Sequence, residues 1–329
     1  MDQPLPHKWL FSKEGLDQNQ EAAHERAAQI LRDQAPRLLR AEPRPLQLKE
    51  GYDLVNFYAW KLTELCKLSS APSEVQWTAL VFFRRFFATA SPMEFDPLSM
   101  IFACVHVACK VEEMREITLD KLLEAGGVVD LRTKVTDLEL ELLQGLEFEL
   151  MVEPKIRPSL RMLTQECRGL PEQLEELLQR AEAVVFEVCA TSSALLLFPP
   201  SALIAAALDV ALEEAGTKGA VLTTLAQHFK EKERAEFQQI FTEAVQAMKQ
   251  MSCRAELNRE AMQDIAKAAR KCQKAFERIR EEQKQRHEAR CTERKRRRND
   301  AKAVQDLEEL KRKAHAIRGD RQELSNMEV

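Results

Sequence analysis

Glycine is scarce in this sequence and proline is absent from its last 129 residues, and both features favour helices. The 329 residues include 9 glycines and 2 tyrosines, and the last of the 13 prolines is Pro200. Glycine and proline are the residues that most disfavour a helix, so a chain with few of them favours helical structure. No segment shows the alternating apolar and polar pattern of a strand. The sequence therefore predicts an all-α protein.

Long apolar runs and paired cysteines are also missing. The longest apolar run, 194–208, is interrupted by two prolines and a serine, and it falls short of the ~20 residues that a membrane helix needs. The N-terminus has no basic start followed by an apolar stretch, so we expect no signal peptide. The 8 cysteines include no C-x-x-C pair. We expect a soluble, intracellular protein with free thiols.

Motifs for catalysis and for metal binding are absent from the sequence. The 6 histidines form no H-E-x-x-H motif and have no metal-ligand spacing with the cysteines. There is no glycine-rich phosphate-binding loop and no G-x-S-x-G motif. We therefore expect that the protein is not an enzyme and has no metal or cofactor.

The net charge of -4 hides an uneven distribution. Residues 252–329 carry 22 basic against 15 acidic residues, a balance of +7, whereas the first 251 residues carry 27 against 38, a balance of -11. An acidic body does not favour phosphate backbones, so we expect no direct nucleic-acid binding by the body. The basic C-terminal extension leaves such binding open.

Five consecutive basic residues stand out within the extension: Arg294, Lys295, Arg296, Arg297 and Arg298. The run has three interpretations: a nuclear import signal, a patch for nucleic acid or an acidic partner, and a solvated helix surface. Helix solubility does not require five basic residues in succession. We favour import, which predicts a nuclear protein.

Two segments about a hundred residues apart resemble copies of one helix. Shifting the first by 103 positions brings six residues into identity: Phe95/Phe198, Pro97/Pro200, Ile101/Ile204, Ala103/Ala206, Val107/Val210 and Ala108/Ala211. Lys110 of the first copy then falls on Glu213 of the second. This pattern predicts a duplicated helical unit that binds a partner through one copy only.

The helix signals place these copies within two five-helix units. Ser73 to Gln76 has the form of a capping box, and Asp96 followed by Pro97 has the form of a helix N-cap. The predicted domains are an N-terminal helical extension at 1–47, a first unit at 48–152, a second at 153–251 and a basic, helix-prone extension at 252–329. We expect helix near the body at the start of this extension and fraying of the helix beyond it.

A polar stripe crosses the helix that opens at Pro97. From Ile101 to Val111 only His106 and Lys110 are polar, and their face extends to Ser99 and Glu113. A helix that is apolar nearly all round lies at the centre of its bundle. We therefore expect this polar stripe to be the one solvent-exposed face of the helix.

The predicted helix at 131–147 has two faces. One is apolar and faces the core, and it consists of Val135, Leu138, Leu142 and Leu146. The other carries Glu139, Leu143 and Leu150. The second face packs on another helix of the same unit, or it forms a partner groove rimmed by Glu139 and Lys110. The spacing alone leaves both interpretations open.

At this point the motifs resemble those of a known family. A-C-K-V-E-E at 108–113, A-L-V-F-F-R-R-F-F at 79–87 and L-E-L-E-L-L-Q-G-L-E-F-E-L at 138–150 are similar to three helices of the cyclin box. The resemblance to the cyclin family covers residues 48–251 and implies two tandem five-helix boxes with additional N-terminal and C-terminal helices. In cyclins, a lysine and a glutamate of the first box hydrogen-bond the kinase segment that contains its regulatory helix.

The resemblance transfers this kinase-binding role to Lys110 and Glu139. The neighbouring apolar positions are Val107, Val111, Leu143, Phe148 and Leu150. The implied protein is a non-catalytic subunit that binds and activates a cyclin-dependent kinase of the CDK-activating, transcription type. Implied partners are a RING-finger assembly factor and the general transcription factor TFIIH. The helix at 54–62 lacks the substrate-docking patch of cell-cycle cyclins.

One alternative uses the same duplicated box. A TFIIB-like factor grips promoter DNA, and it would have a cysteine-rich zinc ribbon before the boxes and a basic body. This chain has no cysteine before Cys66, and its first 251 residues are acidic. The kinase-binding interpretation would fail if Lys110 and Glu139 were both engaged by their own chain and the groove beside them were sealed.

Overall fold

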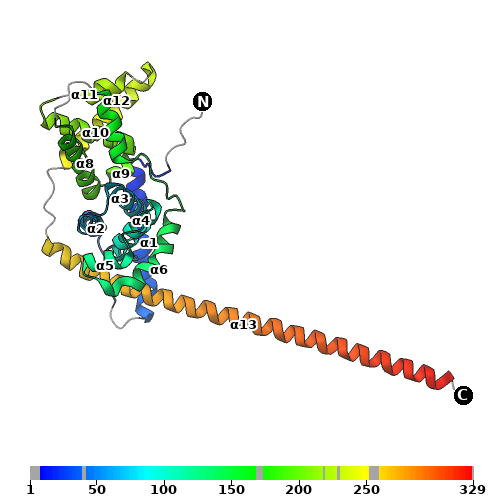
Figure 1. Ribbon diagram of the computed structural model, residues 1–329. Helices are drawn as coiled ribbons and strands as arrows, with labels where there is room; N and C mark the ends of the chain where they lie inside the picture. The colour runs from blue at the N-terminus through cyan, green and yellow to red at the C-terminus, as the bar shows by residue number, and fades with distance from the viewer. Residues whose placement is uncertain are drawn as a thin grey trace. The chain divides into compact units, whose positions relative to one another are not determined.

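A computed structural model describes residues 8–38, 42–167, 173–217, 219–227, 230–251 and 259–327. Within these ranges every regular element is a helix and there is no strand (Figure 1). The prediction of an all-α fold is confirmed. The chain divides into two compact units, Met1–Ala275 and Phe276–Val329.

The first five-helix unit follows the N-terminal helix α1 (Lys13–Leu38). It consists of α2 (Leu48–Leu68), α3 (Ser73–Phe86), α4 (Pro97–Val111), α5 (Leu119–Gly126) and α6 (Arg132–Gly145), with a 3₁₀ turn at Val129–Leu131. Helix α4 packs against α2, α3, α5 and α6, and it is buried along most of its length. It is therefore the central helix, as its nearly continuous apolar sequence predicts.

The two predicted helix starts have different outcomes. The Asp96 side chain accepts hydrogen bonds from the backbone N–H groups of Leu98 (3.2 Å) and Ser99 (3.4 Å), so Asp96 caps α4 as expected. The prediction of a capping box that begins at Ser73 is wrong. Helix α3 already includes Ser73, its N-cap is Pro72, and the Ser73 hydroxyl bonds the Glu74 carboxylate instead of a backbone N–H.

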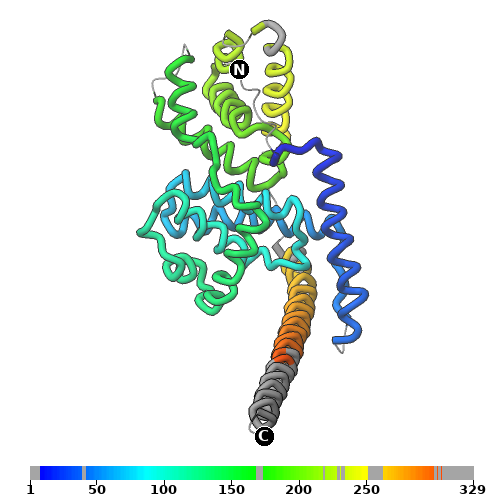
Figure 2. The backbone as a smooth tube through the Cα atoms, turned by 90° about the vertical axis from the view of Figure 1, so that its right-hand side faces the viewer, coloured from blue at the N-terminus to red at the C-terminus, as the bar shows by residue number. Residues whose placement is uncertain are grey.

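The second unit repeats the plan of the first. It consists of α7 (Ile156–Glu166), α8 (Leu174–Thr191), α10 (Pro200–Glu214), α11 (Ala220–Ala226) and α12 (Glu231–Met251), with a short additional helix α9 (Ala194–Leu197). Its central helix is α10, which packs against α7, α8, α11 and α12. The two units thus place the two copies of the repeated segment at equivalent positions, and Figure 2 shows α1 outside both.

A buried arginine joins the two five-helix units. Arg84 of α3 donates from Nε to the Cys189 carbonyl (3.0 Å) and from Nη2 to the Ala190 carbonyl (2.6 Å), at the C-terminal end of α8. Its Nη1 donates to Asn56 Oδ1 at 2.7 Å. Burial lowers the pKa of Arg84 to about 10, so the side chain stays charged at neutral pH. A cation among helix C-terminal carbonyls is electrostatically favourable.

The C-terminal extension contains α13 (Arg259–Met327). Within the first compact unit, its beginning packs on the body: Gln273 Nε2 donates to the Pro92 carbonyl (2.9 Å), and Cys272 Sγ lies 3.3 Å from the Arg44 carbonyl. Helix near the body is therefore present as expected, whereas the predicted fraying beyond it is wrong, because α13 continues to Met327. The division between second box and extension at residue 252 stays a prediction.

Candidate functional site

Lys110 and Glu139 meet where α4 packs on α6. Lys110 Nζ donates to Glu139 Oε2 at 2.7 Å, and His106, one turn earlier on α4, places Nε2 at 3.2 Å from Glu139 Oε1. The carboxylate therefore accepts a hydrogen bond from one residue of the neighbouring helix and lies against a second. The Lys110 side chain is 53% exposed and that of Glu139 only 20%, so the lysine is the accessible member of the pair.

His106 is held neutral by its surroundings. Burial lowers the pKa of its imidazole, and the positive charges of Lys110 and Arg132 lower it further, against the opposing effect of Glu139. The neutral ring places Nε2 beside Glu139 Oε1, and its Nδ1 is buried without a hydrogen-bond partner among the described residues. His106 therefore packs against the glutamate without contributing a charge.

The surface beside the pair is open. The kinase-binding interpretation would fail if both charged ends were engaged by their own chain and the groove beside them were sealed. The first condition is met, because Lys110 and Glu139 pair with each other. The second condition is not met at the charged end of the surface, because a cavity of about 770 Å³ opens there and is lined by His106, Lys110, Glu113, Arg132 and Glu139, among others. None of the predicted apolar neighbours lines this cavity. The pair is thus preassembled at the rim of an accessible hollow.

The predicted apolar neighbours differ in accessibility. Val107 is only 4% exposed and supports the surface from beneath, whereas Val111, Leu143 and Leu150 are half-buried. Phe148 is 63% exposed. The predicted core face of α6 is correct, since its four apolar residues are all buried. The prediction that the polar stripe of α4 reaches the surface at Ser99 is wrong. Ser99 is fully buried, and its hydroxyl donates to Asp96 Oδ2 at 2.6 Å.

Two large apolar residues of this surface were missed by sequence reasoning. Leu140 on α6 is 58% exposed and Met151, just past the predicted set, is 78% exposed. Leu140 is one helical turn from Leu143, so the i, i+3 spacing could have identified it. Exposed leucine, phenylalanine and methionine in one stretch of chain are typical of a protein-binding surface.

An unusual turn presents Phe148 to solvent. Glu147 and Phe148 both have left-handed backbone conformations, with φ of 50° and 60°. The Phe148 N–H donates to the Leu143 carbonyl at 2.9 Å, which closes the C-terminal end of α6. Left-handed conformations cost a non-glycine residue about 1–2 kcal/mol. Such backbone strain at an exposed aromatic residue is often found at functional sites.

The N-terminal segment holds this turn in place. Lys8 forms an ion pair with Glu147, and Trp9 Nε1 donates to Glu149 Oε2 at 2.6 Å. Two residues later, the Phe11 N–H donates to the Leu196 carbonyl of the second five-helix unit at 2.8 Å. The segment 8–11 therefore links the turn that carries Phe148 to the second unit.

The second unit has a charge-reversed counterpart of the pair. Glu213, which aligns with Lys110, forms an ion pair from α10 with Lys249 of α12. Asp209 aligns with His106, and burial raises the pKa of its carboxyl. The repeat thus keeps an interhelical ion pair and reverses its polarity, which agrees with binding of a given partner by one copy only.

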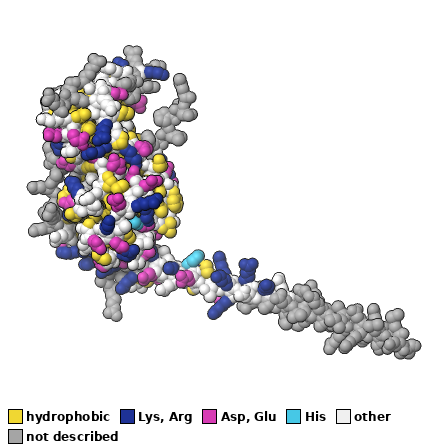
Figure 3. Space-filling view, in the orientation of Figure 1, with side chains coloured by type: hydrophobic (Ala, Val, Ile, Leu, Met, Phe, Trp, Pro, Cys, Tyr) yellow, Lys and Arg dark blue, Asp and Glu magenta, His cyan; other side chains and the backbone are white. Residues whose placement is uncertain are grey.

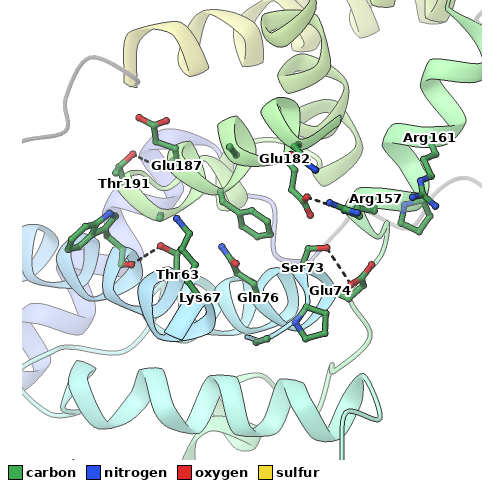
Figure 4. Close-up of a pocket in the computed structure, with 18 residues that line it drawn as sticks. Thr63, Lys67, Ser73, Glu74, Gln76, Arg157, Arg161, Glu182, Glu187 and Thr191 are labelled. Atoms are coloured by element: carbon green, nitrogen blue, oxygen red, sulfur yellow. Dashed lines mark hydrogen bonds and ion pairs between the residues drawn. The ribbon is translucent and has the colours of Figure 1, made fainter. Parts of the chain in front are cut away.

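Other features of the chain lie apart from this surface. A larger cavity of about 1160 Å³ is lined by residues of α2, α3, α7 and α8, including the ion pair of Arg157 and Glu182, and none of the predicted site residues lines it (Figure 4). The described residues contain no cluster of three or more potential metal ligands. Within the described chain, no helix is long and apolar enough to cross a membrane.

Comparison with known sequences identifies the family. Residues 43–151, which include the whole first five-helix unit, match the sequence model of the cyclin N-terminal domain. The chain therefore contains a cyclin N-terminal domain. It is similar to Cyclin-H1-1 of Arabidopsis thaliana, with 29% identity over 62% of this chain and 68% of the relative. It is also similar to Cyclin CCL1 of Saccharomyces cerevisiae, with 31% identity over 46% of this chain and 41% of that one.

These relatives support a resemblance to cyclin H within the family. The same resemblance is expected from the K-W-L-F-S motif at 8–12 and from L-L-L-F-P-P-S-A-L-I-A-A-A-L at 195–208. Both segments have structural roles in this chain, because the first provides Lys8, Trp9 and Phe11 and the second contributes Leu196 and the start of α10.

Solved structures show the same fold. A chain of the CAK complex from Chaetomium thermophilum bound to ATP-γ-S has a TM-score of 0.65, with 24% identity over 84% of this chain and 91% of that one. A chain of the yeast TFIIK complex (Kin28/Ccl1/Tfb3) has a TM-score of 0.57, with 23% identity over 73% and 96%. The two five-helix units are therefore tandem cyclin boxes.

Proposed function

We propose that this cyclin is a regulatory subunit that binds a cyclin-dependent serine/threonine kinase and holds its regulatory helix in the active position. The observation that carries the proposal is the open surface of the first box. There the Lys110–Glu139 pair borders a cavity of about 770 Å³. Exposed apolar residues follow from Leu140 to Met151.

The proposed mechanism is stabilisation of one state of the kinase. An active kinase needs a lysine–glutamate pair that orients the ATP phosphates, and this pair forms only when the regulatory helix is in place. A surface that contacts the helix in that position alone shifts the kinase to its active state by differential affinity. Because the Lys110–Glu139 pair is already assembled between α4 and α6, binding has little ordering cost at these two residues.

The two kinds of contact have separate roles. Lys110 and Glu139 supply charge-assisted hydrogen bonds to backbone groups of the kinase. Val111, Leu143, Phe148 and Leu150 exclude water around these bonds, with Val107 as buried support. In this mechanism the cyclin makes no contact with ATP and transfers no phosphate itself.

The identity of the kinase follows from the relatives. Similarity to Cyclin-H1-1 and Cyclin CCL1, and to chains of the CAK and TFIIK complexes, supports a CDK-activating kinase as the partner. A RING-finger assembly factor and TFIIH are the further partners we propose. The kinase would act on the activation loops of other kinases and on the RNA polymerase II tail.

Co-expression with candidate kinases, followed by mass spectrometry of the purified complex, tests this function. We expect a stoichiometric complex with a CDK-activating kinase and an increase in its phosphotransfer rate. The cyclin purified without a kinase should have no phosphotransfer activity. A chain that binds no cyclin-dependent kinase in this experiment would contradict the proposal.

We propose nuclear localisation through the basic run of α13. Arg294, Lys295, Arg296, Arg297 and Arg298 are all exposed. A fluorescent fusion of the full chain with these five residues changed to glutamine should remain in the cytoplasm. Unchanged nuclear fluorescence, with the kinase absent from the cell, would contradict this role.

A further inference from the structure

Helix α13 carries a face made of arginine. At 3.6 residues per turn, Arg286, Arg290, Arg294, Arg297 and Arg298 fall within an arc of about 120°. All five side chains are exposed, and Figure 3 shows Lys and Arg side chains gathered on the described part of this helix. We call these five residues the arginine face. No acidic residue of the segment 281–300 falls within the arc.

The arginine face is unfavourable for the helix itself. Arg286, Arg290, Arg294 and Arg298 follow one another at i, i+4 spacing, and like charges at this spacing destabilise a helix. Two members of the face are paired, as Arg286–Glu282 (2.6 Å) and Arg297–Glu293 (2.9 Å), and both glutamates lie outside the arc on the same side. Among the described residues, the other three arginines make no ion pair. The face therefore lacks an internal counter-charge.

The spacing of the face fits a linear polyanion. The thirteen helical residues from Arg286 to Arg298 span about 18 Å between the first and the last. Over that length one strand of DNA carries about five phosphates, at about 3.4 Å of helix axis per charge. Five arginines on one face can thus meet about five phosphates. Arginine is also suited to this contact, because its planar fork matches a phosphate in two hydrogen bonds.

Other anionic partners fit less well. An anionic membrane would bind a helix that also has an apolar face, whereas Ala289 and Cys291 are the only apolar residues between 284 and 298. A phosphorylated peptide presents isolated phosphates, which need a local cluster of arginines and not a row.

We propose that the arginine face of α13 binds the phosphate backbone of nucleic acid without sequence specificity.

The test is binding of the full chain to a short DNA duplex and to single-stranded RNA of the same length, over a series of salt concentrations. With five phosphate contacts, the logarithm of the duplex binding constant should fall against the logarithm of salt with a slope of about -4.5. Comparing the duplex with the single strand shows which nucleic acid supplies the backbone. Because purified components contain no import receptor, the result is independent of the nuclear import role.

A pair of matched variants tests the position of the face. Arg290→Gln/Arg294→Gln removes two positive charges from it, and should reduce the slope by about 1.8 and weaken binding. Lys295→Gln/Arg296→Gln removes the same charge from outside the arc and should have a smaller effect. Equal helical circular dichroism of the two variants controls for folding.

Three results would overturn the proposal. One is the absence of salt-dependent binding to either nucleic acid by the full chain. Another is an equal loss of binding in the two double variants, which would mean that only the total charge matters. The third is binding to a multiply phosphorylated peptide but to neither nucleic acid.

Discussion

At the scale of single residues, Phe148 is exposed in a conformation that favours glycine. Phe148→Gly removes the ring and permits φ of 60° without strain. We expect the free energy of unfolding to stay unchanged or to rise by up to about 1 kcal/mol. Kinase binding should nevertheless weaken by at least about 1 kcal/mol, as loss of an exposed aromatic anchor predicts. Chemical denaturation and titration with the kinase measure the two quantities.

Ser70→Gly is the matched control for Phe148→Gly, because Ser70 also has a positive φ, of 53°, at the end of α2. It should give the same backbone effect and leave kinase affinity unaltered. If Phe148→Gly bound the kinase as tightly as Ser70→Gly does, Phe148 would not be part of the interface.

His106 makes the chain sensitive to acid. Its pKa in the folded chain is lowered from 6.5 by burial and by Lys110, so below pH 6.5 the unfolded chain takes up a proton that the folded chain resists. Stability therefore falls as the pH falls through this range. His106→Gln should reduce the fall, measured as the free energy of unfolding above and below pH 6.5. Some sensitivity should remain, because burial lowers the pKa of His24 as well.

His287→Gln replaces an exposed imidazole and serves as the control for the acid effect. It should leave the dependence of stability on pH as it is in the parent chain. A dependence that is the same for His106→Gln and His287→Gln would rule out His106 as its source.

At the scale of elements, the N-terminal segment positions a surface that it does not belong to. Trp9→Phe keeps a ring but loses the hydrogen bond to Glu149, and hydrogen bonds to charged groups contribute about 1.5–3 kcal/mol. We expect faster amide exchange at Phe148 and weaker kinase binding. Hydrogen exchange with mass spectrometry measures the first effect. Phe11→Leu, in the same segment, should leave exchange at Phe148 unchanged.

The elements also show what sequence could predict. The central helices α4 and α10 follow from their apolar sequences and from Asp96 and Pro97, because helix propensity and capping are local. The position of Trp9 against Glu149 could not be predicted, since 140 residues separate the two. Ser73 was assigned to a capping box because the pattern fits, yet the structure begins the helix one residue earlier, within the usual variation of helix ends.

At the scale of the whole molecule, Arg84 couples the two boxes. Arg84→Lys keeps the charge but cannot reach the Cys189 and Ala190 carbonyls and Asn56 together. We expect a loss of about 2–4 kcal/mol in the free energy of unfolding, because buried acceptors remain unsatisfied. Arg180→Lys changes an exposed arginine that pairs with Glu214, and should cost less than about 1 kcal/mol. Equal losses would exclude a coupling role for Arg84.

The duplication was predictable and the coupling of its copies was not. Six identities at a spacing of 103 residues indicate the repeat directly. The sequence also predicted that Lys110 and Glu139 lie on one surface, although it did not predict that they pair with each other or that His106 lies against Glu139. Those contacts depend on how α4 and α6 pack, which residue spacing within one helix does not determine.

The central claim is that the Lys110–Glu139 surface of the first box binds the kinase. The most direct test is the kinase affinity of Lys110→Ala/Glu139→Ala beside that of Arg180→Ala/Glu214→Ala, which removes an exposed ion pair from the second box. We predict that the first variant keeps nearly all its stability, because Lys110 is half exposed, and loses about 2–5 kcal/mol of binding free energy. The second variant should bind like the parent chain. Equal affinity of the two variants for the kinase would contradict the account.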